Sequence, residues 1–440
     1  MSTKKVSHRR KNSLKSIPTW IWVVAFLLVL SAHSYRLFTR IHEPGINDVQ
    51  TRGFVDFHNA IYFPVNSFLS GGNPYSRQYA ESHPDGRSFP LFPPHSLILH
   101  APLSMWPIDH ARYVYFGFEL LVFGLLTCWI LTMVNVKVGI REFLMLGTFI
   151  MLTVPCYSQL YLGQLTFQLV LASLVAVYHS RTRPWLAGVA LSIAACKPQF
   201  AIPIALLLLC RKDWKTVLIG GAIASTLSLI GIFVIGSNVG FTEFFTELQA
   251  NYFSLNSHPE LGNPAENYRR IDFYPLIVRM TDGGLPNWQK LAVTFGCLMT
   301  GGMGVCALRK YPSFDPVSNL LICLTTLGCI YHSHYDLLLL VLPLVSIWLG
   351  HPKIWRKLPA WFRWTMFAIL LALVWNAFHL TRIQEAFGLD ADQSDMRWRI
   401  ATSLSSLAIV VGIVLCTGMS FIISKKVASV TQSMAKTRAP

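Results

Sequence analysis

The sequence predicts an all-α polytopic membrane protein with about twelve transmembrane helices and short surface helices in its outer loops. Of the 440 residues, 53% are hydrophobic and only 13% are charged, and apolar runs recur along most of the chain. A soluble domain carries about 25% charged residues, whereas a run of about 20 apolar residues crosses the hydrocarbon core of a bilayer. The alternating pattern of an outer-membrane barrel is absent from the sequence.

Basic residues set the predicted topology. They lie in short clusters between the apolar runs, so the net charge of +16 indicates membrane orientation, and we expect no nucleic-acid partner. With a cytoplasmic N-terminus, these clusters fall repeatedly on one side, and both termini lie inside. A cleaved signal peptide is the alternative for the first run. The predicted spans are 19–37, 111–134, 142–158, 164–180, 185–197, 198–210, 216–236, 289–308, 315–331, 335–350, 360–380 and 400–424.

The domain organisation follows from these spans. We expect a basic cytoplasmic tail at 1–18, a single transmembrane domain at 19–426 and a second cytoplasmic tail at 427–440. Three outer loops result, and they are rich in Phe, Tyr, Pro and Leu, which predicts short helices on the membrane surface. These loops cover about 38–110, 237–288 and 381–399.

Residues 185–210 admit two interpretations. One long helix would put Arg183 and Arg211 on opposite sides of the membrane, against the charge pattern. Two short helices that meet at Lys197-Pro198 keep both arginines inside, and a proline disfavours helix at the preceding residue. The sequence therefore favours a hairpin at this position.

The candidate functional residues gather at the outer ends of the predicted spans. Ionisable groups at membrane depth are costly, which makes each of them a candidate. They are Asp48, Asp56, His58, Gln164, Lys197, Arg269, Arg270, His332, His334 and Asp336.

Each candidate also has a purely structural explanation. Asp56 could cap a surface helix, Lys197 could extend from a helix end to the interface, and Gln164 could cap a span. The two arginines could bind lipid headgroups, and the two histidines could lie at the interface with hydrogen-bond partners.

The His-Ser-His-Tyr-Asp segment at 332–336 raises the question of a metal. Histidines two residues apart share one face on a strand but not on a helix, and this segment lies at a helix boundary. The sequence also lacks HExxH, GxGxxG, a P-loop and GxSxG. We therefore expect neither a metal site nor a cofactor.

Several stretches together resemble glycosyltransferase family 87, a family of C-type membrane glycosyltransferases. They are DFHNAIYFPVNSFLSGGNPYS (56–76), FPLFPPHSLILHAPLSMWP (89–107), the Gly-Gln turn through the Lys-Pro hairpin (163–209) and HSHYDLLLLVLP (332–343). The family includes polyprenyl-phosphate-mannose-dependent mannosyltransferases and arabinofuranosyltransferases of the bacterial envelope. Near Gln164 the family more often has aromatic residues or asparagine, whereas this chain has Gly-Gln-Leu-Thr.

The resemblance implies a catalytic transmembrane domain in a bacterial plasma membrane, with its active site on the outer face. It implies Asp56 as the catalytic base, and Lys197 with the 332–336 segment near the donor phosphate. Gln164 is expected to contact donor phosphate or sugar, and Asp48, His58, Arg269 and Arg270 are accessory candidates. The implied partners are a polyprenyl-phosphate-linked sugar, with mannose first, a glycolipid or glycan acceptor, and membrane lipids.

The chemistry of such a donor agrees with a single base. The phosphate leaving group needs little protonation, so one carboxylate that takes the acceptor proton is sufficient. Direct displacement then inverts the anomeric carbon. Two alternatives remain open: a transporter or flippase, which would have ionisable groups at mid-membrane, and a polysaccharide polymerase or ligase, which would depend on outer arginines such as Arg269 and Arg270.

Overall fold

The computed structural model describes residues 17–41, 53–82, 89, 92–257, 267, 269–281, 286–376 and 396–436. Within these ranges the chain forms helices, and the described residues contain no β-strand. One isolated antiparallel bridge joins Arg270 to Ser333. The all-helical class predicted from the sequence is thus confirmed.

Five helices are long and apolar enough to cross a membrane, or six if one bent pair counts as a span. The five are α1 (Thr19–Ile41), α6 (Ile108–Met133), α12 (Trp214–Val239), α16 (Asn287–Leu308) and α22 (Met396–Lys436). The length and apolar composition of these helices indicate a membrane protein. The predicted number of twelve spans is not confirmed.

The span predicted at 142–158 is two helices that meet at 81°, α7 (Ile140–Met151) and α8 (Val154–Leu162). The break has a local cause. Thr153 caps α8 by accepting a hydrogen bond from the backbone N of Cys156 at 3.4 Å, and Pro155 lies in the first turn. Threonine at the cap and proline in the first turn both favour a helix start at this position.

The other predicted spans are short helices. A full crossing needs about 20 residues, whereas each of these segments has between 10 and 17. They are α9 (Thr166–His179), α10 (Pro184–Ala194), α11 (Pro198–Cys210), α17 (Asp315–Cys329), η6 with α18 (His334–Leu340 and Val341–Leu349) and α20 (Ala360–Trp375).

The segments predicted to be outer loops contain short helices. The first loop holds α2 (Val55–Phe57), η3 (His58–Tyr62), α3 (Phe63–Leu69), α4 (Arg77–Ser82), α5 (His95–His100) and η4 (Ala101–Met105). The second holds α13 (Phe241–Ser257) and α15 (Phe273–Thr281). Most of the third loop, 381–399, lies outside the described residues. The remaining short elements are η5 (Pro312–Phe314) and α19 (Ile354–Lys357).

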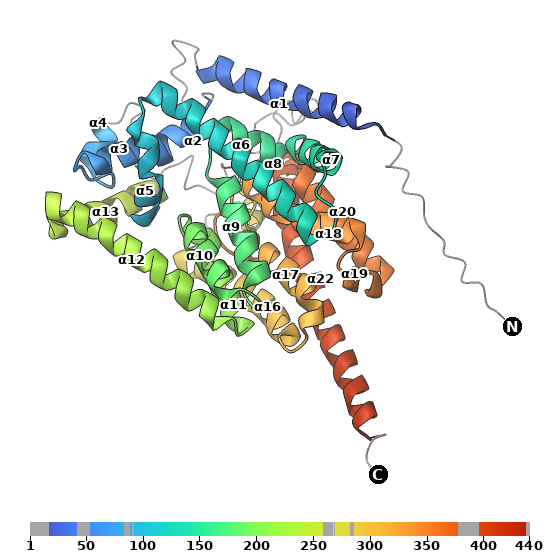
Figure 1. Ribbon diagram of the computed structural model, residues 1–440. Coiled ribbons are helices and arrows are strands. Elements are labelled where there is room, and N and C mark those ends of the chain that lie inside the picture. Colours follow the sequence, from blue (N-terminus) through green and yellow to red (C-terminus); the bar gives the residue numbers. More distant parts are fainter. Residues whose placement is uncertain are drawn as a thin grey trace.

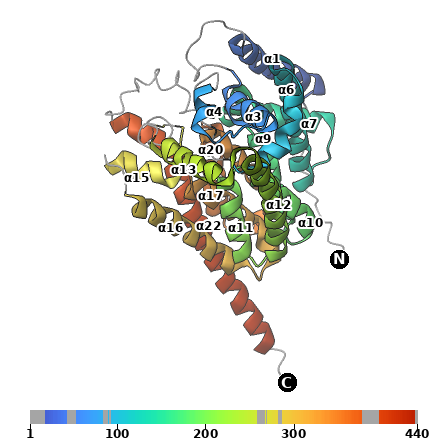
Figure 2. The same cartoon turned by 90° about the vertical axis from the view of Figure 1, so that its left-hand side faces the viewer.

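Two helices extend beyond the central bundle. Helix α1 lies along its edge, and the C-terminal part of α22 projects from it in both views (Figures 1 and 2). The 41 residues of α22 span about 60 Å, roughly twice the hydrocarbon thickness. The predicted tail at 427–440 thus begins as helix, which continues to Lys436. Figure 2 shows α15 and α16 beside α22, and these helices contact one another.

A buried arginine ties together one end of the bundle. The Arg211 guanidinium donates to Asp213 Oδ2 at 2.6 Å and to the carbonyl O of Val177 at 2.7 Å. Nearby, Arg181 donates to the carbonyl O of Arg309 at 2.8 Å. Arginines from three different connections therefore gather at the same end, as the charge pattern of the sequence predicts.

The hairpin at Lys197 is also confirmed. Helix α10 ends at Ala194 and α11 begins at Pro198. Arg211, at the end of α11, reaches the hydroxyl of Ser180, only three residues before Arg183. Both arginines thus belong to one end of the bundle, and Lys197 lies at the other end of α11.

Candidate functional site

The carboxylate of Asp336 is the centre of a buried polar cluster. It is fully buried, and the Lys197 ammonium lies 3.3 Å from each of its oxygens. His332 Nδ1 lies 2.8 Å from Oδ2, the backbone N of Ser333 donates to Oδ2 at 3.2 Å, and Thr166 Oγ1 lies 3.5 Å from Oδ1. Three segments far apart in the sequence therefore converge on one carboxylate.

Local sequence explains the position of Asp336. Ser333 and Asp336 form a capping box at the start of η6, in which each side chain bonds to the backbone of the other. The segment before it is fixed by the second outer loop, because Ile271 N donates to the carbonyl O of His332 at 3.0 Å. The His-Ser-His-Tyr-Asp sequence is thus a helix start, as its predicted position at a helix boundary requires.

Both ring nitrogens of His332 have hydrogen-bond partners. Its Nδ1 faces the Asp336 carboxylate, and its Nε2 faces the carbonyl O of Gln199 at 3.2 Å. Both neighbours are hydrogen-bond acceptors, and a histidine ring can donate to such groups. The Lys197 ammonium and the His332 ring therefore surround the Asp336 carboxylate with hydrogen-bond donors, the kind of group that also binds an anionic ligand.

Two helices begin at this cluster. Thr166 is the first residue of α9, and Pro198, the first residue of α11, follows Lys197 directly. The N-terminus of a helix carries a partial positive charge, which adds to the attraction for an anion.

Tyr335 connects this cluster with the loop that carries Asp56. The Lys197 ammonium lies 4.9 Å from the centre of the Tyr335 ring, which is within the range of a cation–π interaction. Tyr335 also packs with Val55 and Leu162. Val55 directly precedes Asp56, so the residue before the predicted base packs against the ring that Lys197 contacts.

Asp56 is half-buried at the start of α2 and is held by contacts of its neighbours. Phe54 adopts a left-handed backbone conformation with φ 59°, and its N–H donates to the carbonyl O of Tyr161 at 2.8 Å. The Phe57 ring stacks on Tyr115 with 4.6 Å between the ring centres. The first outer loop is thus fixed against α6 and against the end of α8.

Gly163 allows the loop and the Gln164 turn to approach closely. It has φ 68°, a conformation that side chains disfavour, and an added Cβ would overlap the Phe54 ring and lie 2.9 Å from Phe57 Cβ. We expect Gly163→Ala to destabilise the folded protein by about 1–3 kcal/mol and to displace both Asp56 and Gln164. Thermal unfolding in nanodiscs would measure the loss of stability, and an activity assay would measure the effect of the displacement.

A helical glycine with open surroundings serves as the control for this substitution. No atom would lie within 4 Å of a Cβ at Gly117. Gly117→Ala should therefore leave unfolding temperature and activity near wild type. Equal behaviour of the two variants would show that the close approach at Gly163 is unimportant.

Buried amides border the same region and lack hydrogen-bond partners. The Oε1 atom of Gln164 and both amide atoms of Asn59 are buried and unsatisfied within the described structure. Asn59 lies three residues after Asp56, one helical turn away. Asn59 was not among the residues predicted from the sequence, although an amide one turn from a candidate base is a recognisable signal. Amides of this kind suit sugar hydroxyls, which both donate and accept.

The remaining predicted residues have other partners. His58 Nε2 accepts a hydrogen bond from Arg112 Nε at 2.9 Å, and His334 Nε2 lies 2.7 Å from Ser158 Oγ. Arg270 forms two bonds of 3.0 Å to Asp272, so its charge is paired. Arg269 contributes its carbonyl O to His334 N. Asp48 lies outside the described residues.

Glu119 is a buried carboxylate that was not predicted from the sequence. It lies inside the apolar run of α6, and its Oε2 and Oε1 accept hydrogen bonds from Gln159 at 2.8 Å and Gln168 at 2.9 Å. An acidic residue within a predicted span is costly to bury, and this signal could have identified Glu119 from the sequence.

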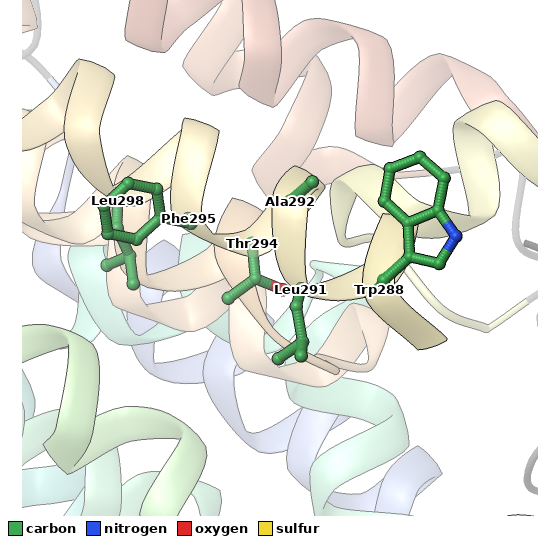
Figure 3. Close-up of a pocket in the computed structure, with 6 residues that line it drawn as sticks. All are labelled: Trp288, Leu291, Ala292, Thr294, Phe295 and Leu298. Carbon is green, nitrogen blue, oxygen red and sulfur yellow. The ribbon is translucent and has the colours of Figure 1, made fainter. Parts of the chain in front are cut away.

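An apolar groove lies elsewhere on the surface, along α16. It has a volume of about 460 Å³ and contains no titratable side chain, so it is separate from the polar cluster. Its lining residues, shown in Figure 3, are Trp288, Leu291, Ala292, Thr294, Phe295 and Leu298. In the described part of the chain, no group of three or more His, Cys, Asp or Glu residues is arranged to hold a metal ion.

Comparison with known proteins gives one match. A family model for glycosyltransferase family 87 matches residues 91–333, more than half of the chain. The matched segment includes Gln164, Lys197 and His332, begins after Asp56 and ends three residues before Asp336. No curated protein and no solved structure matches significantly.

Proposed function

Since the chain belongs to glycosyltransferase family 87, we propose that this membrane glycosyltransferase moves a sugar from a polyprenyl-phosphate donor to a hydroxyl of a lipid or glycan acceptor. Mannose is the first candidate for the sugar. The observation that carries the proposal is the buried cluster of Lys197, His332 and Asp336, whose Lys197 ammonium contacts the Tyr335 ring while Val55, the neighbour of Asp56, packs against the same residue. In this proposal the phosphate lies at the Lys197 cluster and the reacting hydroxyl at Asp56.

In the proposed reaction, Asp56 accepts the proton of the acceptor hydroxyl while that oxygen bonds to the anomeric carbon. The bond from the anomeric carbon to the phosphate oxygen breaks, and its electron pair stays on the phosphate. Lys197, His332 and the starts of α9 and α11 stabilise the charge that develops there. Attack opposite the leaving group inverts the anomeric carbon, and Gln164 and Asn59 contact the sugar hydroxyls.

The arrangement of the helices supports an outer-face site. The Arg181, Arg211 and Arg309 connections gather at one end of the bundle, and the Lys197 cluster lies at the other end of α11. By the positive-inside rule the arginine end is cytoplasmic. We therefore place the site at the periplasmic face of a bacterial inner membrane, with both termini in the cytoplasm.

Pairing of Arg270 with Asp272 weakens the polymerase or ligase alternative. That class would use outer arginines to bind its substrate, whereas the charge of Arg270 is already neutralised. Glu119 is a buried carboxylate of the kind that a transporter could use, but its contacts instead hold the Gln164 turn through Gln159.

The donor class can be tested with purified protein in nanodiscs. Labelled polyprenyl-phosphate mannose, arabinofuranose and glucose would each be supplied with an envelope-lipid acceptor extract, beside nucleotide sugars as the control. We expect transfer from one lipid-phosphate sugar and none from nucleotide sugars, because the proposed phosphate site adjoins the membrane. Transfer from a nucleotide sugar alone would contradict the proposal.

A further inference from the structure

The second outer loop pairs with the segment that begins at His332. Arg270 of the loop and Ser333 form an isolated antiparallel bridge. Backbone hydrogen bonds flank this bridge, because Ile271 N donates to the carbonyl O of His332 at 3.0 Å and His334 N donates to the loop backbone at 2.9 Å. The backbone that leads into the buried polar cluster therefore takes its position from the loop.

The Arg279 guanidinium joins this loop to the helix bundle. Arg279 lies on α15, and its two terminal nitrogens donate to the carbonyl O of Asn267 at 2.8 Å and to the carbonyl O of Thr402 at 2.7 Å. The Asn267 carbonyl also accepts from Arg270 N at 3.1 Å, directly beside the bridge to Ser333. Thr402 belongs to α22. One side chain therefore connects the loop with the C-terminal helix.

The geometry of an arginine suits this connection. Its planar guanidinium carries N–H donors in a fixed fork, so two nitrogens can hold two carbonyl groups at a defined separation. The ammonium of a lysine is a single point at the end of a flexible stem, and it does not fix such a separation. Arg279 thus sets where Asn267 lies relative to α22.

Burial of Arg279 carries a cost that packing alone does not explain. Its side chain is 2% exposed, and no carboxylate among the described residues forms an ion pair with it. Its Nε is also buried without a hydrogen-bond partner within the described structure. A buried charge is unfavourable, and apolar residues can often replace buried charged groups without loss of stability. The two carbonyl groups that it holds therefore explain the guanidinium better than core packing does.

The contacts that hold Asp56 are separate from this connection. Phe54 N donates to the carbonyl O of Tyr161, and the Phe57 ring stacks on Tyr115. These residues belong to the first outer loop, α6 and α8. A displacement of the second outer loop should therefore disturb the proposed phosphate site more than the proposed base.

We propose that Arg279 is a positioning residue for the donor-phosphate site. It fastens Asn267 to α22, and the loop fixed in this way holds the backbone from His332 towards Asp336. Its hydrogen bonds reach the site through the loop backbone. The kinetic consequence rests on the proposed function, whereas the coupling between Arg279 and the paired backbone segments can be measured without it.

Hydrogen exchange of the protein in nanodiscs tests the coupling. Arg279→Met removes both side-chain bonds and the buried charge but keeps a long apolar side chain. The Asn267 carbonyl retains its bond from Arg270 N, so we expect the variant to fold. The amides of Ile271 and His334 should exchange about tenfold faster or more, because hydrogen bonds from a charged donor contribute stability of that order to the closed loop.

Two further variants separate the connection from the charge. Lys290→Met also removes a positive charge near α15, where Lys290 lies 5.3 Å from the Tyr274 ring centre. Lys290 is exposed on α16, so this control should leave exchange and transfer unchanged. Arg279→Lys keeps the charge but does not fix both carbonyl groups. Its exchange should lie between that of wild type and that of Arg279→Met.

Steady-state kinetics test the positioning role. In Arg279→Met, kcat/KM for the lipid-phosphate donor should fall about tenfold to a hundredfold, because misplaced catalytic groups cost rates of that order. KM for the acceptor should stay unchanged, since the contacts of the first outer loop remain in place. A general loss of structure would instead impair the use of both substrates alike.

Three results would overturn this inference. Unchanged exchange of Ile271 and His334 in Arg279→Met would show that other contacts fix the loop. If that variant does not fold, Arg279→Lys decides the question, and wild-type exchange in it would show that the fork of Arg279 is not needed. Equal losses for donor and acceptor would contradict the positioning role. Absence of transfer by the wild-type protein would refute the proposed function only, because the exchange measurement does not depend on it.

Discussion

Asp56→Asn is expected to reduce sugar transfer by about 10²–10⁴-fold, the usual contribution of a general base. Asparagine has nearly the same size and shape as aspartate, but its amide cannot take the acceptor proton. Asp56 is half-buried, and its neighbours Phe54 and Phe57 make the packing contacts of the loop. The variant should therefore fold normally and bind the donor, and initial rates in nanodiscs with labelled donor would measure the loss.

Asp109→Asn is the matched control for this experiment. Asp109 lies in the first turn of α6. Its side chain is 77% exposed and forms an ion pair with Arg112. Exposed pairs contribute little, so this variant should keep its activity. Full transfer by Asp56→Asn would contradict the assignment of the base and leave Asp48 as the next carboxylate to replace.

Features set by neighbouring residues could be predicted from the sequence. The Lys197-Pro198 hairpin follows from a proline and two flanking arginines, and the short helices of the outer loops follow from local composition. The number of membrane spans was harder to predict from the sequence than these local features. Apolar composition does not show where a helix bends, as it does at Thr153, or where it is too short to cross.

For the candidate site, too, single residues could be selected from the sequence, but their contacts could not be predicted. Lys197, His332 and Asp336 could be selected one by one, because ionisable groups at membrane depth are rarely without a role. Their mutual contacts depend on three segments that only the fold brings together. Glu119 and Asn59 were missed because their surroundings, which only the fold shows, make them notable. Glu119 accepts hydrogen bonds from two glutamine amides. The amide of Asn59 is buried and has no hydrogen-bond partner among the described residues.

Asp336→Asn should destabilise the protein much more than Lys197→Met, although both remove the same ion pair. The Asp336→Asn substitution would leave Lys197 as a buried cation without an anion, and an uncompensated buried charge costs about 3–5 kcal/mol. Lys197→Met instead leaves Asp336 with its contacts to His332 at 2.8 Å and to the backbone N of Ser333 at 3.2 Å. Thermal unfolding in nanodiscs should therefore rank wild type above Lys197→Met, and Lys197→Met above Asp336→Asn.

The double variant separates stability from function. Lys197→Met with Asp336→Asn removes the buried cation and the buried anion together, so neither is left unpaired. Its unfolding temperature should therefore rise above that of Asp336→Asn alone. Transfer should not return, because the Lys197 cation proposed to stabilise the departing phosphate is lost. Recovery of both stability and activity would show that the cluster only supports the fold, and equal instability of the two single variants would show that an unpaired Lys197 is not the cause of the loss.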